Sequence, residues 1–119
     1  MTDNAPPIRP VRLPTHLIVS GLLRVIENEG GFATVISKGE RDAGVLLILT
    51  QERDKNARLW ERMPQLDGTR SFECTREEDP DSKDEFTKYL LNRTTQDPDC
   101  WVVELEISKP ERFIELIAG

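Results

Sequence analysis

The sequence predicts one α+β domain, in which three helices accompany a mainly antiparallel sheet of about five strands, in the order αββββαβα. The chain has 119 residues, a common size for one domain with a single hydrophobic core. Segments with helical spacing of apolar residues are separated by short segments that alternate or are continuously apolar, as strands are. Capping boxes of the form Ser-x-x-Glu stand before two of the expected helices.

The first helix is expected after a Pro-rich arm that covers residues 1–14, and residues 15–119 are expected to form the single domain. The helix begins at Thr15, which we expect to be the N-cap, and ends at the glycine pair Gly30 and Gly31. Gly21 stands in the middle of this helix, where glycine costs about 1 kcal/mol relative to alanine. This glycine therefore suggests a close approach to another backbone.

Four strands are expected next, at residues 32–38, 45–51, 58–63 and 70–75. Short polar or glycine-containing turns join them, which favours an antiparallel meander. The strand at 45–51 is almost continuously apolar, and this indicates burial on both faces and a central place in the sheet.

The second helix is predicted to begin at the capping box Ser82–Glu85. One stripe of this helix contains Phe86, Tyr89, Leu90 and Arg93. The turn Asp97-Pro98-Asp99 leads into the last strand, 100–107, where one face is apolar through Trp101 and its alternate neighbours. A second capping box, Ser108–Glu111, opens the final helix. These patterns do not set the order of the strands in the sheet.

The net charge of the chain is −6, and its distribution along the sequence is uneven. Residues 1–70 hold ten Lys and Arg against nine Asp and Glu, whereas residues 71–119 hold six against thirteen. An acidic surface repels the phosphate backbone of nucleic acids, whose binding needs several cationic contacts. General nucleic-acid binding is therefore disfavoured.

No apolar segment has the length and composition of a signal peptide or a membrane span, so we expect a cytoplasmic protein without membrane contact. Cys74 and Cys100 belong to different expected strands and lack the spacing of a redox or metal motif. We expect both to be buried, reduced thiols.

Several stretches resemble the small alphaproteobacterial proteins grouped as domain of unknown function 1491. The matching stretches are VSGLLR at 19–24, GGFATVISKGERDAG at 30–44, LWERMP at 59–64 and DPDCWVVELE at 97–106. The resemblance implies a single-domain, cytoplasmic bacterial protein, and it implies no activity that can be assigned to a residue. It also implies a larger apolar residue where Cys100 stands, which argues against a functional thiol there.

The expected third and fourth strands offer a candidate surface for a protein partner. Strand alternation places Arg58, Trp60 and Arg62 on one face, and Arg70, Phe72 and Cys74 on one face of the neighbouring strand. The candidate partner-binding residues are Arg58, Trp60, Arg62, Arg70 and Phe72, because Trp and Arg often carry interface energy. A simpler interpretation is a core pair of Trp60 and Phe72, with arginine stems that reach water or meet Glu104 and Glu106.

A small anion is the alternative ligand. Lys38 and Arg41, with two glycines in their loop and with Arg24, offer cations and backbone N–H groups for a phosphate or carboxylate. An ordinary connection between strands explains the same loop. Asp97 and Asp99 offer carboxylates, but an aspartate turn explains them without a metal ion, and we predict no metal site.

No catalytic residue or cofactor is predicted, because the single histidine, His16, has no partner in sequence with which to form a catalytic pair. The sequence favours a non-enzymatic protein-binding or adaptor module, monomeric or homodimeric. Its protein partner is expected to use either the Arg and Trp face or the acidic segment 77–85. The alternative is a small domain or enzyme that binds an anion or nucleotide through the 38–44 loop and the 97–99 turn.

Overall fold

The computed structural model describes residues 13–117, so almost all of the predicted Pro-rich arm lies outside the described residues. The α+β class and the order αββββαβα are confirmed. The elements are α1 (Thr15–Asn28), β1 (Phe32–Ser37), β2 (Leu46–Gln51), β3 (Arg58–Pro64), β4 (Arg70–Glu77), α2 (Lys83–Gln96), β5 (Trp101–Glu106) and α3 (Glu111–Leu116). Among residues 13–117, no helix is long and apolar enough to cross a membrane.

The five strands form one sheet in the order β1-β5-β2-β3-β4. β5 lies between β1 and β2, antiparallel to the first and parallel to the second, so Val103 stands opposite both Val35 and Ile48. The predicted central place of β2 is confirmed. The predicted meander holds for β2, β3 and β4 but is wrong for β1 and β2, which are not neighbours.

The position of β5 follows from its burial. Trp101, Val102 and Val103 are all buried, so both faces of this strand need apolar neighbours. A strand of this kind gains more inside the sheet than at its edge. β5 therefore takes the interior place, and β1 forms the edge.

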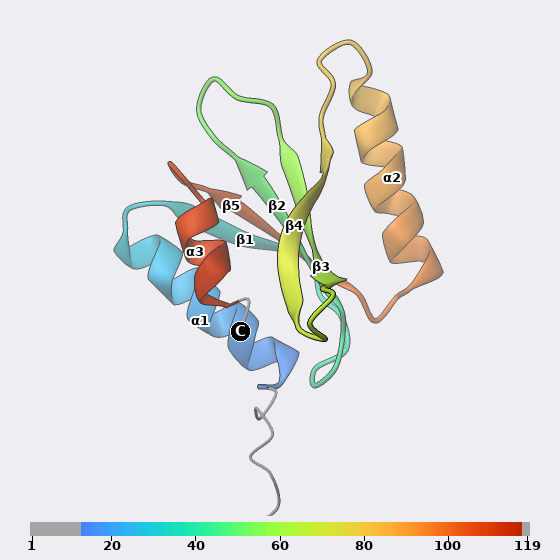
Figure 1. Cartoon of the computed structure of the whole chain (residues 1–119). Coiled ribbons are helices and arrows are strands. Elements are labelled where there is room, and N and C mark those ends of the chain that lie inside the picture. The colour runs from blue at the N-terminus through green and yellow to red at the C-terminus, as the bar shows by residue number, and fades with distance from the viewer. Residues whose placement is uncertain (1–12, 118–119) are drawn as a thin grey trace, which may run out of the picture.

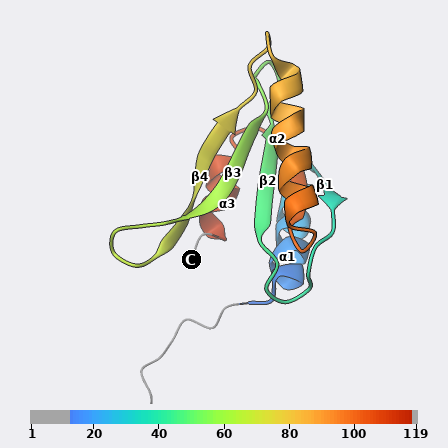
Figure 2. The ribbon, with the colours of Figure 1, turned by 90° about the vertical axis from the view of Figure 1, so that its right-hand side faces the viewer.

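The helices cover the two faces of the sheet unequally. α1 and α3 lie on one face and α2 lies on the other (Figures 1 and 2). The core under α1 and α3 includes Ile26, Ile48, Trp101, Leu105 and Phe113. The smaller core under α2 contains Leu47, Ala57, Leu59, Phe86, Cys100 and Val102.

The start of α1 is fixed by the 38–44 loop and not by a side-chain N-cap. Thr15 is the first helical residue and Pro14 takes the N-cap position, so the prediction for Thr15 is wrong. The backbone N–H groups of Thr15 and His16 donate to the carbonyls of Asp42 and Arg41, at 3.0 and 2.9 Å. The loop carbonyls therefore satisfy N–H groups that a helix start leaves open.

The two capping boxes mark helix starts but do not cap them through side chains. α2 begins directly after Ser82, whose side chain makes no capping hydrogen bond. α3 begins at Glu111, with Pro110 at the N-cap and no side-chain cap. A proline there has a preset φ of −64° and no N–H group to satisfy, so the serine is not required.

The two cysteines differ in exposure. Cys100 is buried, as predicted, whereas Cys74 is exposed, so the prediction is wrong for this thiol. Cys74 lies on β4, which is an edge strand of the sheet, as β1 is, and has a neighbour on one side only. Burial raises the pKa of Cys100 above that of an ordinary thiol.

Candidate functional site

The predicted alternation of cations and aromatic rings is present on β3 and β4. In the register of these strands, Arg62 stands opposite Phe72 and Trp60 opposite Cys74. The guanidinium of Arg58 lies 5.0 Å from the centre of the Trp60 ring, and that of Arg62 lies 5.1 Å from the Phe72 ring. The two strands therefore carry one continuous row of cation–π pairs.

The aromatic members of this row belong to the core. Phe72 is 9% exposed, and Trp60 is half-buried against the core under α1 and α3. The Nε1 group of Trp60 donates to Oγ1 of Thr50 at 2.9 Å, so its polar atom is satisfied inside the protein. Arg70 is the exposed member of the five predicted residues.

The arginines of the row hold α3 against the sheet. Nη2 of Arg58 forms ion pairs with Glu111, in the first turn of α3, and with Glu52 at 2.9 Å. Nη2 of Arg62 donates to the carbonyl of Ile117, at the other end of α3, at 3.2 Å. Burial works to raise the pKa of Glu111, but the hydrogen bond and charge of Arg58, a backbone hydrogen bond and the charge of Lys55 together outweigh it and lower the pKa.

Glu104 and Glu106 do not meet these arginines, so that part of the prediction is wrong. Glu104 pairs with Thr34 and Leu49 in the sheet, and alternation along β5 turns it to the face that α2 covers. The arginines point to the opposite face. Burial, aided by the negative charge of Glu106, raises the pKa of Glu104.

The 38–44 loop and the 97–99 turn lie against each other. The backbone N–H of Glu40 donates to the carbonyl of Asp99 at 2.9 Å. A Cβ atom on Gly39 would lie 2.1 Å from this carbonyl oxygen, and one on Gly44 would lie 2.4 Å from it. The two glycines therefore allow this close contact, which accounts for them without a ligand.

The hydrogen-bonding groups of this contact have partners within the chain. The carboxylate of Glu40 accepts from the N–H groups of Asp42 and Ala43, and Asp97 Oδ1 accepts from the N–H of Asp99 at 3.1 Å. Such bonds are the expected chemistry of aspartate turns. Anion binding here stays a prediction.

The cations of the anion hypothesis belong to two different parts of the fold, the 38–44 loop and α1. Lys38 and Arg41 are exposed side chains of the loop, and Arg24 is exposed on the third turn of α1. Among residues 13–117, no group of three or more His, Cys, Asp or Glu side chains is placed to hold a metal ion.

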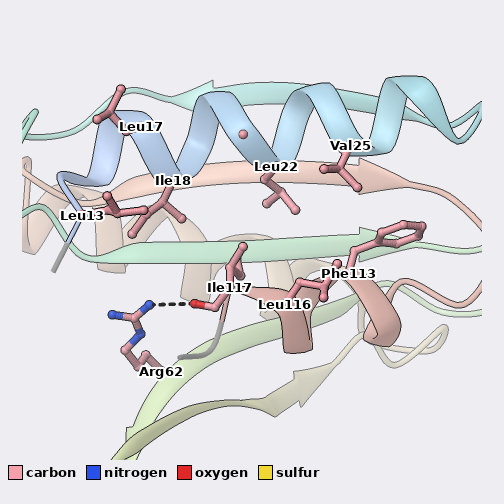
Figure 3. A pocket seen from close by; sticks show the side chains of 10 residues that line it. Leu13, Leu17, Ile18, Leu22, Val25, Arg62, Phe113, Leu116 and Ile117 are labelled. Carbon is pink, nitrogen blue, oxygen red and sulfur yellow. Dashed lines mark hydrogen bonds between the residues drawn. The ribbon is translucent and has the colours of Figure 1, made fainter. Parts of the chain in front are cut away.

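An apolar groove between α1 and α3 is the feature that the sequence did not reveal. Figure 3 shows it from close by, with α1 along one wall and α3 along the other. The cavity volume is about 370 Å³. The α1 wall consists of Leu17, Ile18, Gly21, Leu22 and Val25 on the helix and of Leu13, two residues before it. The opposite wall consists of Phe113, Leu116 and Ile117, and Arg62 lies at one end. We call this feature the α1/α3 groove.

Large apolar side chains of the α1/α3 groove face solvent. The exposed fractions are 57% for Leu13, 48% for Leu17, 37% for Val25 and 73% for Leu116. The signal in the sequence is the spacing of four between Leu17, Gly21 and Val25, which places them on one side of α1, and Leu13 precedes Leu17 at the same spacing. The close approach predicted for Gly21 is absent among residues 13–117, because no heavy atom of theirs outside the neighbouring backbone of α1 lies within 4 Å of the position of its missing Cβ.

A polar cluster joins α2 to the other face of the sheet. Glu61 is buried on β3, and its carboxylate accepts hydrogen bonds from Thr75, Arg93 and the Tyr89 hydroxyl, the last at 3.2 Å. Arg76 stacks over the Tyr89 ring at 3.8 Å. Burial works to raise the pKa of Glu61, but the hydrogen bonds from Thr75 and Arg93 outweigh it and lower the pKa. These polar groups bind one another, so we assign the cluster a structural role in holding α2 to the sheet.

The comparisons with known proteins agree with the fold. The crystal structure of a DUF1491 family protein from Caulobacter crescentus CB15 has 34% sequence identity to this chain. The match covers 86% of this chain and 94% of that protein, with a TM-score of 0.72. An NMR structure of a DUF1491 protein from the same organism has 31% identity over 88% of this chain and 94% of its own, with a TM-score of 0.73.

A third solved structure, protein Atu0922 from A. tumefaciens, has 28% identity over 92% of this chain and 98% of its own, with a TM-score of 0.72. No curated protein matches the chain. The model of the family described as "Protein of unknown function (DUF1491)" matches residues 13–115, which confirms the predicted resemblance. The chain therefore belongs to the DUF1491 family.

Proposed function

We propose that this protein is a non-enzymatic, cytoplasmic protein-binding module, and that it binds an amphipathic helix of a protein partner in the α1/α3 groove. The observation that carries the proposal is the row of exposed apolar side chains along this groove, from Leu13 to Val25 on one wall and Leu116 on the other. Single exposed apolar residues are ordinary on protein surfaces, whereas a contiguous apolar groove is typical of an interaction site.

The shape of the groove favours a helix as its occupant. α1 has 14 residues and is therefore about 21 Å long, the length of a helix of nearly four turns. Both walls are helices, and helices pack with their axes about 8–10 Å apart. Gly21 leaves open space at the middle of the α1 wall, where a second helix can come closest. An amphipathic helix in an apolar groove is a common mode of peptide recognition.

The predicted Arg and Trp face has a supporting part in this proposal. Arg58 and Arg62 hold α3, and α3 forms the second wall of the groove. Direct contact of this face with a partner stays a prediction, and Arg70, which is exposed, is the residue through which it is best tested. Trp60 is unsuitable for that test because its replacement would also disturb the core.

The proposal is tested by affinity capture from native cell lysate with three matched variants. Leu17→Asp changes the groove, Arg70→Glu changes the predicted sheet face, and Leu91→Asp changes an exposed leucine of α2 on the opposite layer. Circular dichroism and thermal unfolding verify that each variant folds. We expect Leu17→Asp alone to lose specific protein partners. The same partner list for Leu17→Asp and Leu91→Asp would contradict binding through the groove.

A further inference from the structure

We propose that β1 accepts an extended segment of a protein partner as a sixth strand of the sheet, and that this segment places a lysine or arginine beside Glu104. The surface is an edge of the five-stranded sheet and is separate from the α1/α3 groove. The inference therefore goes beyond the proposed function and does not depend on it. The partner is defined by its chemistry, as an extended peptide of mainly β-branched residues with a cation at its centre.

The first argument is the open edge of β1. This strand pairs with β5 on one side and has no neighbour on the other. Among residues 13–117, no backbone–backbone hydrogen bond outside that ladder involves residues 32–37. The pairing with β5 is regular from Phe32 to Val35. Over this stretch, the N–H and C=O groups that point away from β5 are therefore available to another strand.

The two edges of the sheet differ in their protection against a further strand. β4 carries four charged side chains, Arg70, Glu73, Arg76 and Glu77. Charges on an edge strand hinder the addition of another strand. β1 has the sequence FATVIS, without a charge or a proline, and its Phe32 and Ile36 side chains are 70% and 56% exposed. β1 is therefore the edge that suits strand addition.

α2 leaves part of its face of the sheet open at β1. Thr34 stands opposite Glu104 of β5, and Phe32 stands opposite Glu106. Opposite residues of paired strands share a face, and here it is the face on which α2 packs. The core under α2 contains no residue of β1, and both Phe32 and Thr34 are exposed. A strand added to β1 would therefore find open apolar surface beside two carboxylates.

The carboxylate of Glu104 indicates the charge of the partner. Glu104 is half-buried between Thr34 on β1 and Leu49 on β2. Burial and the charge of Glu106 both raise the pKa of Glu104, and no cation or hydrogen bond among residues 13–117 acts in the opposite direction. A cation brought close to such a carboxylate stabilises its charged form.

The distances allow a cation of the added strand to reach Glu104. Neighbouring strands are about 5 Å apart, so the added strand would lie about 10 Å from β5. A lysine or arginine opposite Thr34 can extend over this short side chain, and its length and that of Glu104 together span the distance. A second copy of β1 could not supply the charge, because residues 32–37 contain no cation.

The first test is the binding of a labelled peptide, Ser-Val-Thr-Val-Lys-Val-Thr-Val-Ser, to the full-length chain, measured by fluorescence anisotropy. The lysine is central, so it can stand opposite Thr34 in a parallel or an antiparallel strand. We expect saturable binding with a Kd below about 1 mM. A peptide with glutamate in place of the lysine should bind at least tenfold more weakly. No saturable binding of the lysine peptide, or equal binding of the two, would overturn the inference.

A matched pair of variants tests whether the peptide binds at β1. Thr34→Lys places a cation of the chain itself beside Glu104, so it should repel the peptide lysine and weaken binding at least tenfold. This variant should fold, because Thr34 is exposed. Thr87→Lys adds the same charge at an exposed threonine of α2 and should bind as the wild type does. Equal affinities of the two variants would exclude β1 as the site.

A double-mutant cycle tests the contact with Glu104. Glu104→Gln should weaken binding of the lysine peptide at least threefold. A peptide with glutamine in place of the lysine should lose a similar factor on the wild type, and the two changes together should cost little more than either alone. Effects that simply multiply would show that the cation does not meet Glu104.

Hydrogen exchange and amide chemical shifts of the ¹⁵N-labelled chain locate the peptide. We expect slower exchange and shifted resonances at residues 32–37. Shifts confined to α1 and α3 would place the peptide in the α1/α3 groove and overturn the inference. A chain that ignores the peptide but self-associates, and loses this association in Thr34→Lys, would make a second copy the occupant and overturn it as well. The groove is tested independently by Leu17→Asp, so either proposal can fail alone.

Discussion

Removal of the Glu61 carboxylate is expected to loosen α2 from the sheet. α2 buries only Phe86 fully, and Tyr89 and Leu90 in part, so apolar contacts alone hold this helix weakly. Its remaining attachment is the hydrogen-bonded cluster in which Glu61 accepts from Tyr89 and Arg93. We therefore expect Glu61→Ala to destabilise the protein beyond the effect of an ordinary surface change.

The loss of stability in Glu61→Ala depends on how deeply its former partners, Arg93 and Tyr89, stay buried without the carboxylate. Breaking a fully buried ion pair by removing one partner costs about 3–5 kcal/mol. The Arg93 side chain is 29% exposed, so it recovers part of its solvation when Glu61 is gone. Tyr89 is also half-buried, so its hydroxyl recovers part of its solvation in the same way. We expect a loss of about 2–3 kcal/mol in the free energy of unfolding.

The pH dependence of the same variant gives a second measure. The pKa of Glu61 is lowered in the folded protein, so its contribution to stability is present above the unfolded pKa of about 4.3. This contribution is lost as the pH falls through the lowered folded pKa. The difference between wild type and Glu61→Ala should therefore shrink in acid.

Urea unfolding at neutral pH measures the loss, and hydrogen exchange locates it. Glu27→Ala on α1 is the control, because Glu27 is exposed on the helix that covers the other face of the sheet and its change should stay within about 0.5 kcal/mol. Exchange of the α2 amides should accelerate in Glu61→Ala more than exchange of α1. A loss below about 1 kcal/mol, or additive effects of Glu61→Ala and Arg93→Ala in a double-mutant cycle, would refute the argument that this cluster holds α2.

Three further predictions concern single positions. Gly21→Ala should stabilise the protein by about 0.5–1 kcal/mol, measured by thermal unfolding, because the position is open and helical; a loss of stability would contradict this. Gly39→Ala should destabilise by about 1–3 kcal/mol in urea unfolding, because its Cβ would lie 2.1 Å from the Asp99 carbonyl. Glu104→Gln should raise stability at pH 7, because burial and Glu106 raise the folded pKa of this carboxyl. The gain should vanish as the pH falls through that raised pKa, and a gain that persists in acid would exclude the carboxylate charge as its cause.

The elements of the fold were predictable because their signals are local. The apolar run of β2, the stripe of α2 and the turn at Asp97 each depend on neighbouring residues, and each is where the sequence places it. The pairing of β5 with β2 was not predictable, because the residues that it joins, such as Leu46 and Trp101, are 55 apart in the sequence. Burial of Trp101, Val102 and Val103 on both faces explains the pairing once it is seen.

The side-chain partners were harder to predict than the elements. Strand alternation tells which residues of a strand share a face with Arg58 or with Glu104. Only the register of the strands shows that Arg58 and Glu104 lie on opposite faces of the sheet. The groove was missed for a similar reason. Val25 and Leu17 fit an amphipathic helix in sequence, and their exposure depends on how far α3 covers α1.

The arginines of β3 link the predicted surface to the groove. α3 has six residues, too few to be stable as an isolated helix, so its position depends on tertiary contacts. Arg58 binds Glu111 in its first turn and Arg62 binds the carbonyl of Ile117 just after its last residue, where a cation is also favoured by the helix dipole. We therefore expect a change at Arg58 that breaks its pair with Glu111 to disturb the second wall of the groove. Loss of partner binding in an Arg58 variant would thus not show that Arg58 touches the partner, whereas the same loss in Leu17→Asp, with α3 still held in place, would locate the contact in the groove.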